Sequence, residues 1–123
     1  MSAYLAAASA ASFVTFALHT WLAGPVVAGP LLESRDMRPV AKYTNYYCWH
    51  LVTIMLVAMG VGLARAALYP QPRELAWFIL TLAVSFAAWN LWLVAWKKQS
   101  FLKMPQWALF ISIVSLTALG LAA

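Results

Sequence analysis

The chain has 123 residues, of which 65% are hydrophobic and only 9% are charged. Soluble domains contain about 25% charged residues, so this composition excludes an ordinary soluble protein and indicates a membrane protein. The net charge of +5 does not indicate a nucleic-acid partner, because the basic residues stand at the ends of apolar stretches and form no recognition motif.

Four stretches without Lys, Arg, Asp or Glu make up most of the chain: residues 2–32, 43–64, 75–96 and 104–123. A helix of about 20 apolar residues crosses a hydrocarbon core of roughly 30 Å. The sequence therefore predicts an all-α, polytopic membrane protein with one domain over residues 1–123. Short connections make consecutive helices antiparallel neighbours, so we expect an antiparallel four-transmembrane-helix bundle embedded in the lipid bilayer.

The first helix is expected over residues 4–24. Gly24 and Pro25 should end it, because Gly can adopt a left-handed end and Pro cannot continue the hydrogen-bond ladder. Residues 26–32 are apolar but contain Gly29 and Pro30, which is typical of an interfacial or shallow re-entrant segment. A loop of mixed charge follows, from Glu33 to Lys42.

The second helix is expected over residues 43–69, with an aromatic belt at its start. Pro70, Gln71 and Pro72 form a tight connection to the third helix, residues 74–96, and the fourth helix covers residues 104–122. Six of the eight basic residues lie in the first and third connections: Arg35, Arg38, Lys42, Lys97, Lys98 and Lys103. By the positive-inside rule these connections are cytoplasmic, and both termini are non-cytoplasmic.

His19 and His50 are the only histidines, and both lie within apolar stretches, where ionisable groups are rare. Each stands a few residues from the expected boundary that joins the first two helices, so antiparallel packing brings both to a similar depth. If the rings face each other, they suit an axial pair on haem b, a copper or zinc ion with added ligands, or a quinone site with nearby aromatic side chains. The structural alternative is that each ring bonds a backbone carbonyl or a hydroxyl.

Asn90 is the other polar side chain expected at membrane depth. An interhelical hydrogen bond is its expected role, and contact with a bound cofactor is the alternative. Cys48 is the only cysteine, so an intramolecular disulfide is excluded and its role stays open.

Three short segments carry a family resemblance. His19-Thr20, Pro30-Leu31-Leu32 and Trp49-His50-Leu51 are similar to the pattern of uncharacterised small four-span bacterial inner-membrane proteins, in which an H-S-x-L-G-E motif ends the first helix and an A-W-H-L motif opens the second. This chain has Gly24 where that pattern has Glu. The resemblance implies a bacterial host and places both histidines in the family pattern, without implying a reaction.

The sequence favours an accessory or structural subunit that packs laterally against other membrane helices, in a homo-oligomer or a larger complex. The first alternative is a redox or cofactor protein that binds haem b or another metal between His19 and His50. The second is a small oligomeric transporter. An independent enzyme is disfavoured, because no acidic residue lies within the apolar stretches to orient either histidine.

Overall fold

The computed structural model describes residues 1–69 and 71–123, and over these residues the chain is helical and contains no strand. The elements are α1 (Ala3–Ala17), η1 (Leu18–Ala28), α2 (Gly29–Glu33), α3 (Pro39–Leu68), α4 (Glu74–Trp96) and α5 (Gln106–Ala122). Three helical segments, Ala3–Glu33, Pro39–Leu68 and Glu74–Trp96, are long and apolar enough to cross a membrane, whereas α5 has 17 residues. The all-α class is confirmed. Pro70, expected in the second connection, lies outside the described residues.

The prediction that Gly24 and Pro25 end the first helix is wrong, as is the prediction of an irregular segment after them. The helix continues to Glu33, and η1, which contains Pro25, is a π-helix. The five-residue hydrogen-bond spacing of a π-helix is present at the end of η1, where the Gly29 N–H donates to the Gly24 carbonyl. Proline interrupts the four-residue ladder of an α-helix because it lacks an N–H and its ring clashes with the carbonyl one turn back. The π-helix moves that carbonyl away from the proline ring, so the helical segment continues past Pro25.

The other observed boundaries differ from expectation by a few residues. Helix α3 begins at Pro39, since proline suits the first turn of a helix, where its missing N–H has no partner to lose. Lys42 is therefore inside α3, and its Nζ donates to the Leu32 carbonyl at 3.0 Å. The basic side chain thus ties the start of α3 to the end of the preceding helix.

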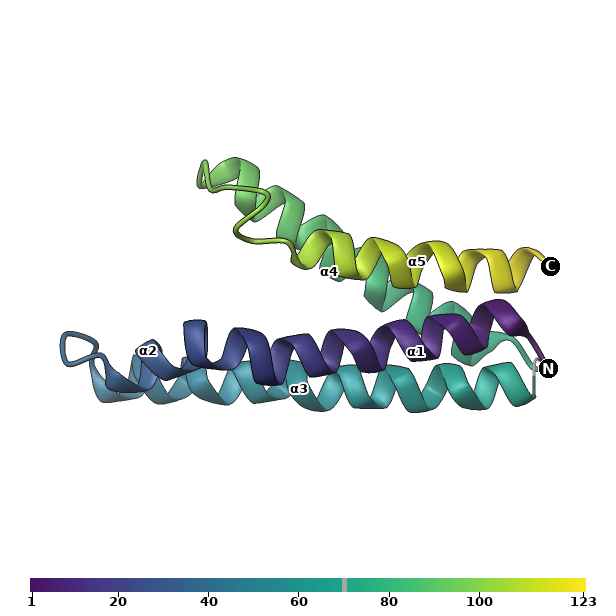
Figure 1. The fold of residues 1–123 in the computed structure, drawn as a ribbon, viewed down its shortest axis with the longest axis horizontal. Coiled ribbons are helices and arrows are strands. Elements are labelled where there is room, and N and C mark those ends of the chain that lie inside the picture. The colour runs from purple at the N-terminus through teal and green to yellow at the C-terminus, as the bar shows by residue number, and fades with distance from the viewer. Residues whose placement is uncertain (70) are drawn as a thin grey trace.

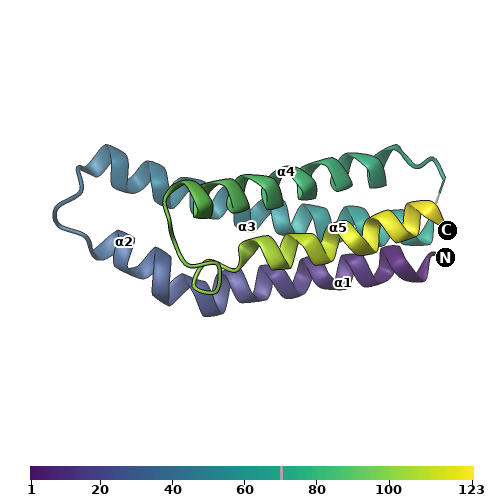
Figure 2. The ribbon, with the colours of Figure 1, turned by 90° about the horizontal axis from the view of Figure 1, so that it is seen from above.

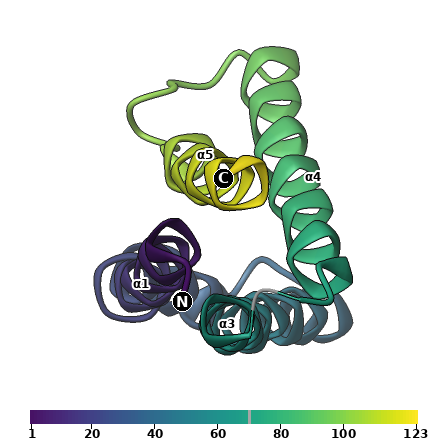
Figure 3. The ribbon, with the colours of Figure 1, turned by 90° about the vertical axis from the view of Figure 1, so that its right-hand side faces the viewer.

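The helices surround the bundle axis in the order α1, α3, α4, α5 (Figure 3). Helix α1 packs against α3 and α5, and α4 packs mainly against α5, while α3 and α4 share few contacts. Figure 1 shows why: α4 diverges from α3 from the end at which α4 begins, at Glu74. Both termini lie at this end of the molecule, and the loops at 34–38 and 97–105 lie toward the other (Figures 1 and 2).

Small residues allow the helices of the core to approach closely. The Ser9 hydroxyl donates to the Gly60 carbonyl at 2.7 Å, which joins α1 directly to the backbone of α3. Around this contact the core consists mainly of aliphatic side chains, including Leu5, Leu56, Met59, Leu63, Ile79 and Ile113. The larger apolar side chains on the outer faces remain exposed, as expected where lipid is the solvent.

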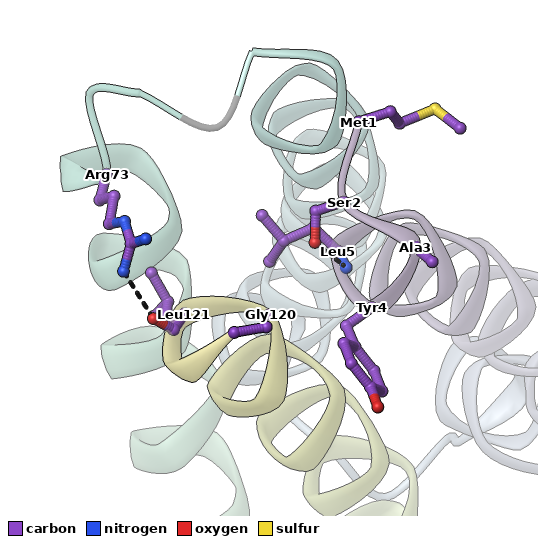
Figure 4. Close-up of a pocket in the computed structure, with 9 residues that line it drawn as sticks. Met1, Ser2, Ala3, Tyr4, Leu5, Arg73, Gly120 and Leu121 are labelled. Atoms are coloured by element: carbon purple, nitrogen blue, oxygen red, sulfur yellow. Dashed lines mark hydrogen bonds between the residues drawn. The ribbon is translucent and has the colours of Figure 1, made fainter.

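Polar contacts also close the bundle at the end that holds the termini. The Arg73 guanidinium donates from Nη1 to the Leu121 carbonyl at 2.6 Å, so the start of α4 is tied to the last turn of α5 (Figure 4). The Ser2 N–H donates to the Ala67 carbonyl of α3 at 2.8 Å. Backbone groups that the helix ends leave without partners are thereby satisfied.

Candidate functional site

His19 is positioned by two residues of α3. Its Nε2 lies 3.2 Å from the Trp49 carbonyl oxygen and 3.0 Å from Thr53 Oγ1. The imidazole also stacks on the Trp49 indole, with ring centroids 3.9 Å apart and planes inclined by 21°. One face and one edge of the ring are therefore occupied by α3, and the rotation of His19 about its side chain is restricted.

The hydrogen bonds of His19 determine its tautomer. A backbone carbonyl only accepts hydrogen bonds, so Nε2 of His19 must carry the hydrogen that it directs toward Trp49. The Thr53 hydroxyl donates to the same carbonyl at 3.2 Å, which leaves its oxygen lone pairs to accept from His19. In the neutral ring, Nδ1 is then the hydrogen-bond acceptor.

His50 lies near the same hydroxyl but is exposed. Its Nδ1 is 3.5 Å from Thr53 Oγ1, and its ring meets the Tyr46 ring edge-on at 4.7 Å. The two histidines are therefore at one level, and Thr53 lies between them. The sequence reasoning missed Thr53, although its place three residues after His50 and four after Trp49 puts all three on one side of a helix.

The hydrogen bonds do not favour an axial metal pair. One nitrogen of each imidazole already approaches Thr53, so a haem iron would have to bind the remaining nitrogens or displace both rings. In the part of the chain that the structure describes, no three His, Cys, Asp or Glu side chains gather as a metal site. Cys48 is exposed and lies one position before Trp49 on α3.

Asn90 joins α4 to α5, and the interhelical role expected for it is confirmed. The Trp107 N–H can only donate, so the oxygen that it meets at 3.0 Å is Asn90 Oδ1. Asn90 Nδ2 then donates to Gln106 Oε1 at 3.3 Å. This direction leaves the Gln106 amide nitrogen with its two N–H groups available.

His19 and Gln106 line one groove with a volume of about 400 Å³. Side chains of η1, α3, α4 and α5 form it, and they are mostly apolar or aromatic: Trp49, Leu51, Val52, Met55, Leu56, Phe86, Trp89 and Phe110. The groove uses the two helices, α3 and α4, that diverge in Figure 1. His50 and Asn90 do not line it. The structure therefore brings His19, but not His50, to the wall of this groove.

No family model, curated protein or solved structure matches this chain. The function is accordingly inferred from the residues and their geometry.

We predict that His19 and Thr53 are energetically coupled, whereas His50 and Thr53 are not. A double-mutant cycle with His19→Phe and Thr53→Val, scored by the free energy of unfolding in mixed micelles, should give a coupling of about 0.6 to 1.7 kcal/mol, the range of intramembrane hydrogen bonds. The parallel cycle with His50→Phe is the control and should give a coupling near zero, because 3.5 Å is a weak contact. Equal couplings in the two cycles would contradict this assignment.

Proposed function

We propose that this chain is a multi-pass protein of the bacterial inner membrane with four spans, and that it serves as an accessory subunit packing laterally against other membrane helices. Three segments that are long and apolar enough to cross a membrane support this proposal by their length and composition. Helix α5 is proposed as the fourth span because its 17 residues reach about 26 Å, close to the roughly 30 Å hydrocarbon core. The position of both termini at one end supports an even number of spans (Figure 2).

The observation that carries the accessory role is the outward face of α4. Thr81, Ser85 and Ala88 are exposed and lie one turn apart along one stripe of this helix. Trp77 and Trp92, which are 55% and 63% exposed, bracket the stripe. Small and hydroxyl side chains let a neighbouring membrane helix approach closely, whereas contact with lipid does not require them. A second membrane helix therefore suits this face better than acyl chains do.

The hydroxyls on this stripe are satisfied by backbone carbonyls of their own helix. Thr81 donates to the Trp77 carbonyl at 2.9 Å, and Ser85 donates to the Thr81 carbonyl at 2.8 Å. Each can remain in an apolar environment without an unsatisfied donor, and its oxygen can still accept a bond from another helix. The stripe thus tolerates lipid in the free subunit and offers contacts in a complex.

The lateral contact is tested by adding bulk to the stripe. The double variant Thr81→Leu/Ser85→Leu should weaken association about tenfold, which corresponds to about 1.4 kcal/mol, because the bulkier side chains prevent close packing. In mild detergent the protein should therefore shift from a larger assembly to the single chain. Ser112→Leu makes the same change at an exposed serine of α5 and is the matched control. Wild-type protein that runs as a single chain, or a double variant that keeps its assembly, would overturn the accessory role.

The proposed orientation has both termini on the non-cytoplasmic side, since the loops at 34–38 and 97–105 share one end and carry most of the basic residues. In a Cys48→Ser background, a cysteine introduced by Ser100→Cys should react with an impermeant maleimide only after the cytoplasmic face is opened. A cysteine introduced by Ser2→Cys should react in intact spheroplasts. The reverse labelling pattern would exclude this orientation.

A further inference from the structure

The groove beside His19 combines aromatic walls with two polar side chains, those of His19 and Gln106. Its walls come from Trp49, Phe86, Trp89 and Phe110, which belong to three different helices. Its volume of about 400 Å³ falls in the range of roughly 300 to 1,000 Å³ typical of small-molecule sites. A flat ring with an apolar tail suits such walls, because aromatic side chains pack favourably on other rings.

The two polar side chains that line the groove, His19 and Gln106, have unused hydrogen-bonding atoms of opposite character. His19 offers an acceptor at Nδ1, because its Nε2 hydrogen is directed to Trp49 and Thr53. Gln106 offers donors at its amide nitrogen, because its Oε1 receives the Asn90 amide. A complementary ligand must therefore present one hydroxyl hydrogen to His19 and one oxygen to Gln106.

We propose that this groove binds the ring of a lipid-soluble hydroquinone, with one ring hydroxyl donating to His19 Nδ1 and a ring oxygen accepting from the Gln106 amide. The ring lies among the four aromatic walls, and the apolar tail extends into the bilayer. This binding function goes beyond the accessory role and does not depend on it, since the stripe on α4 and the groove use different residues.

The tautomer of His19 gives the site a preference between the two redox forms of such a ligand. A quinone carries only carbonyl oxygens, which accept hydrogen bonds, so it cannot donate to Nδ1. A bound quinone would place its carbonyl oxygen against His19 Nδ1, so that two acceptors face each other. The hydroquinone satisfies both His19 and Gln106. One net hydrogen bond corresponds to about a tenfold difference in affinity. The reduced form should therefore bind about tenfold more tightly.

The second feature that favours a ligand here is the local helix geometry. His19 is the second residue of η1, and π-helical turns are frequent at functional sites because they redirect side chains out of the α-helical register. Stacking on Trp49 and the bond to Thr53 then hold the ring in one orientation before any ligand arrives. Preorganisation of this kind reduces the entropy lost on binding.

The test measures retention of decylubiquinol and decylubiquinone by the purified full-length protein under argon, at equal ratios of probe to detergent. We expect one decylubiquinol per chain and about tenfold weaker retention of decylubiquinone. His19→Phe keeps the aromatic stack but removes the acceptor, so it should abolish the preference. His50→Phe is the matched control and should leave it unchanged, because His50 does not line the groove.

A second variant keeps the proposal falsifiable if His19→Phe does not fold. Met55 lines the groove and is 36% exposed, so Met55→Trp fills the cavity with a bulky ring system. Met55→Trp should lower decylubiquinol retention at least tenfold with the helix content unchanged. Equal retention of both probes by the wild type, retention of neither, or full retention by Met55→Trp would each overturn the proposal and leave lipid or a protein helix as the occupant of the groove.

Discussion

Gly120→Leu is expected to lower the free energy of unfolding by about 1 to 3 kcal/mol, the cost of overpacking a core contact. A Cβ at this position would lie 2.7 Å from Leu5 Cγ and Cδ2 and 3.3 Å from the Leu5 backbone nitrogen. Figure 4 shows the same close approach of α5 to α1. Leu5 is only 2% exposed, so its side chain has no free space into which to move. Denaturant titration in mixed micelles measures the loss.

Gly24→Leu is the control for Gly120→Leu. No atom outside the helix lies within 4 Å of a Cβ built at Gly24, so bulk there meets no neighbour. Replacing glycine inside a helix also removes a cost of about 0.5 to 1 kcal/mol. Gly24→Leu should therefore be neutral or slightly stabilising. Equal losses for the two variants would show that α1 and α5 do not pack as described.

Asn90→Leu is expected to destabilise the protein by about 1 to 3 kcal/mol and to loosen the start of α5. The residue before this helix, Pro105, makes no side-chain cap, so the first N–H groups of α5 depend on other partners. Asn90 supplies one of them from α4 by accepting from Trp107. The loss is measured by unfolding in mixed micelles, and the loosening by faster hydrogen exchange of the Trp107 amide.

Two variants separate the capping bond from Trp107 N–H to Asn90 Oδ1 from the bond between the Asn90 and Gln106 side chains. Gln106→Leu removes the bond between the two amide side chains but leaves the Trp107 N–H with its acceptor. Asn90→Asp keeps the Oδ1 acceptor and removes the Nδ2 donor. Both variants should retain the slow exchange of the Trp107 amide. If Gln106→Leu accelerates that exchange as much as Asn90→Leu does, the capping role of Asn90 is wrong.

The sequence by itself determined the chemical class of the chain and the order of its helices. Long uncharged stretches leave a backbone in lipid no alternative to helix formation, because every N–H and carbonyl must bond within its own segment. The selection of His19 and Asn90 as polar residues within apolar stretches follows from the same scarcity of polar groups. The depth of His19 relative to His50 follows from a constant rise per residue in two antiparallel helices.

The tertiary structure alone decided what these residues contact. Helix rotation depends on packing against neighbours, so the sequence could not reveal that His19 stacks on Trp49 or that Thr53 lies between the histidines. Local propensity disfavours a π-helix, so the sequence could not reveal that the helix continues past Pro25 as η1 and contacts α3 through His19. The groove exists because α4 diverges from α3, and that angle results from contacts among four helices, which no single stretch of sequence specifies.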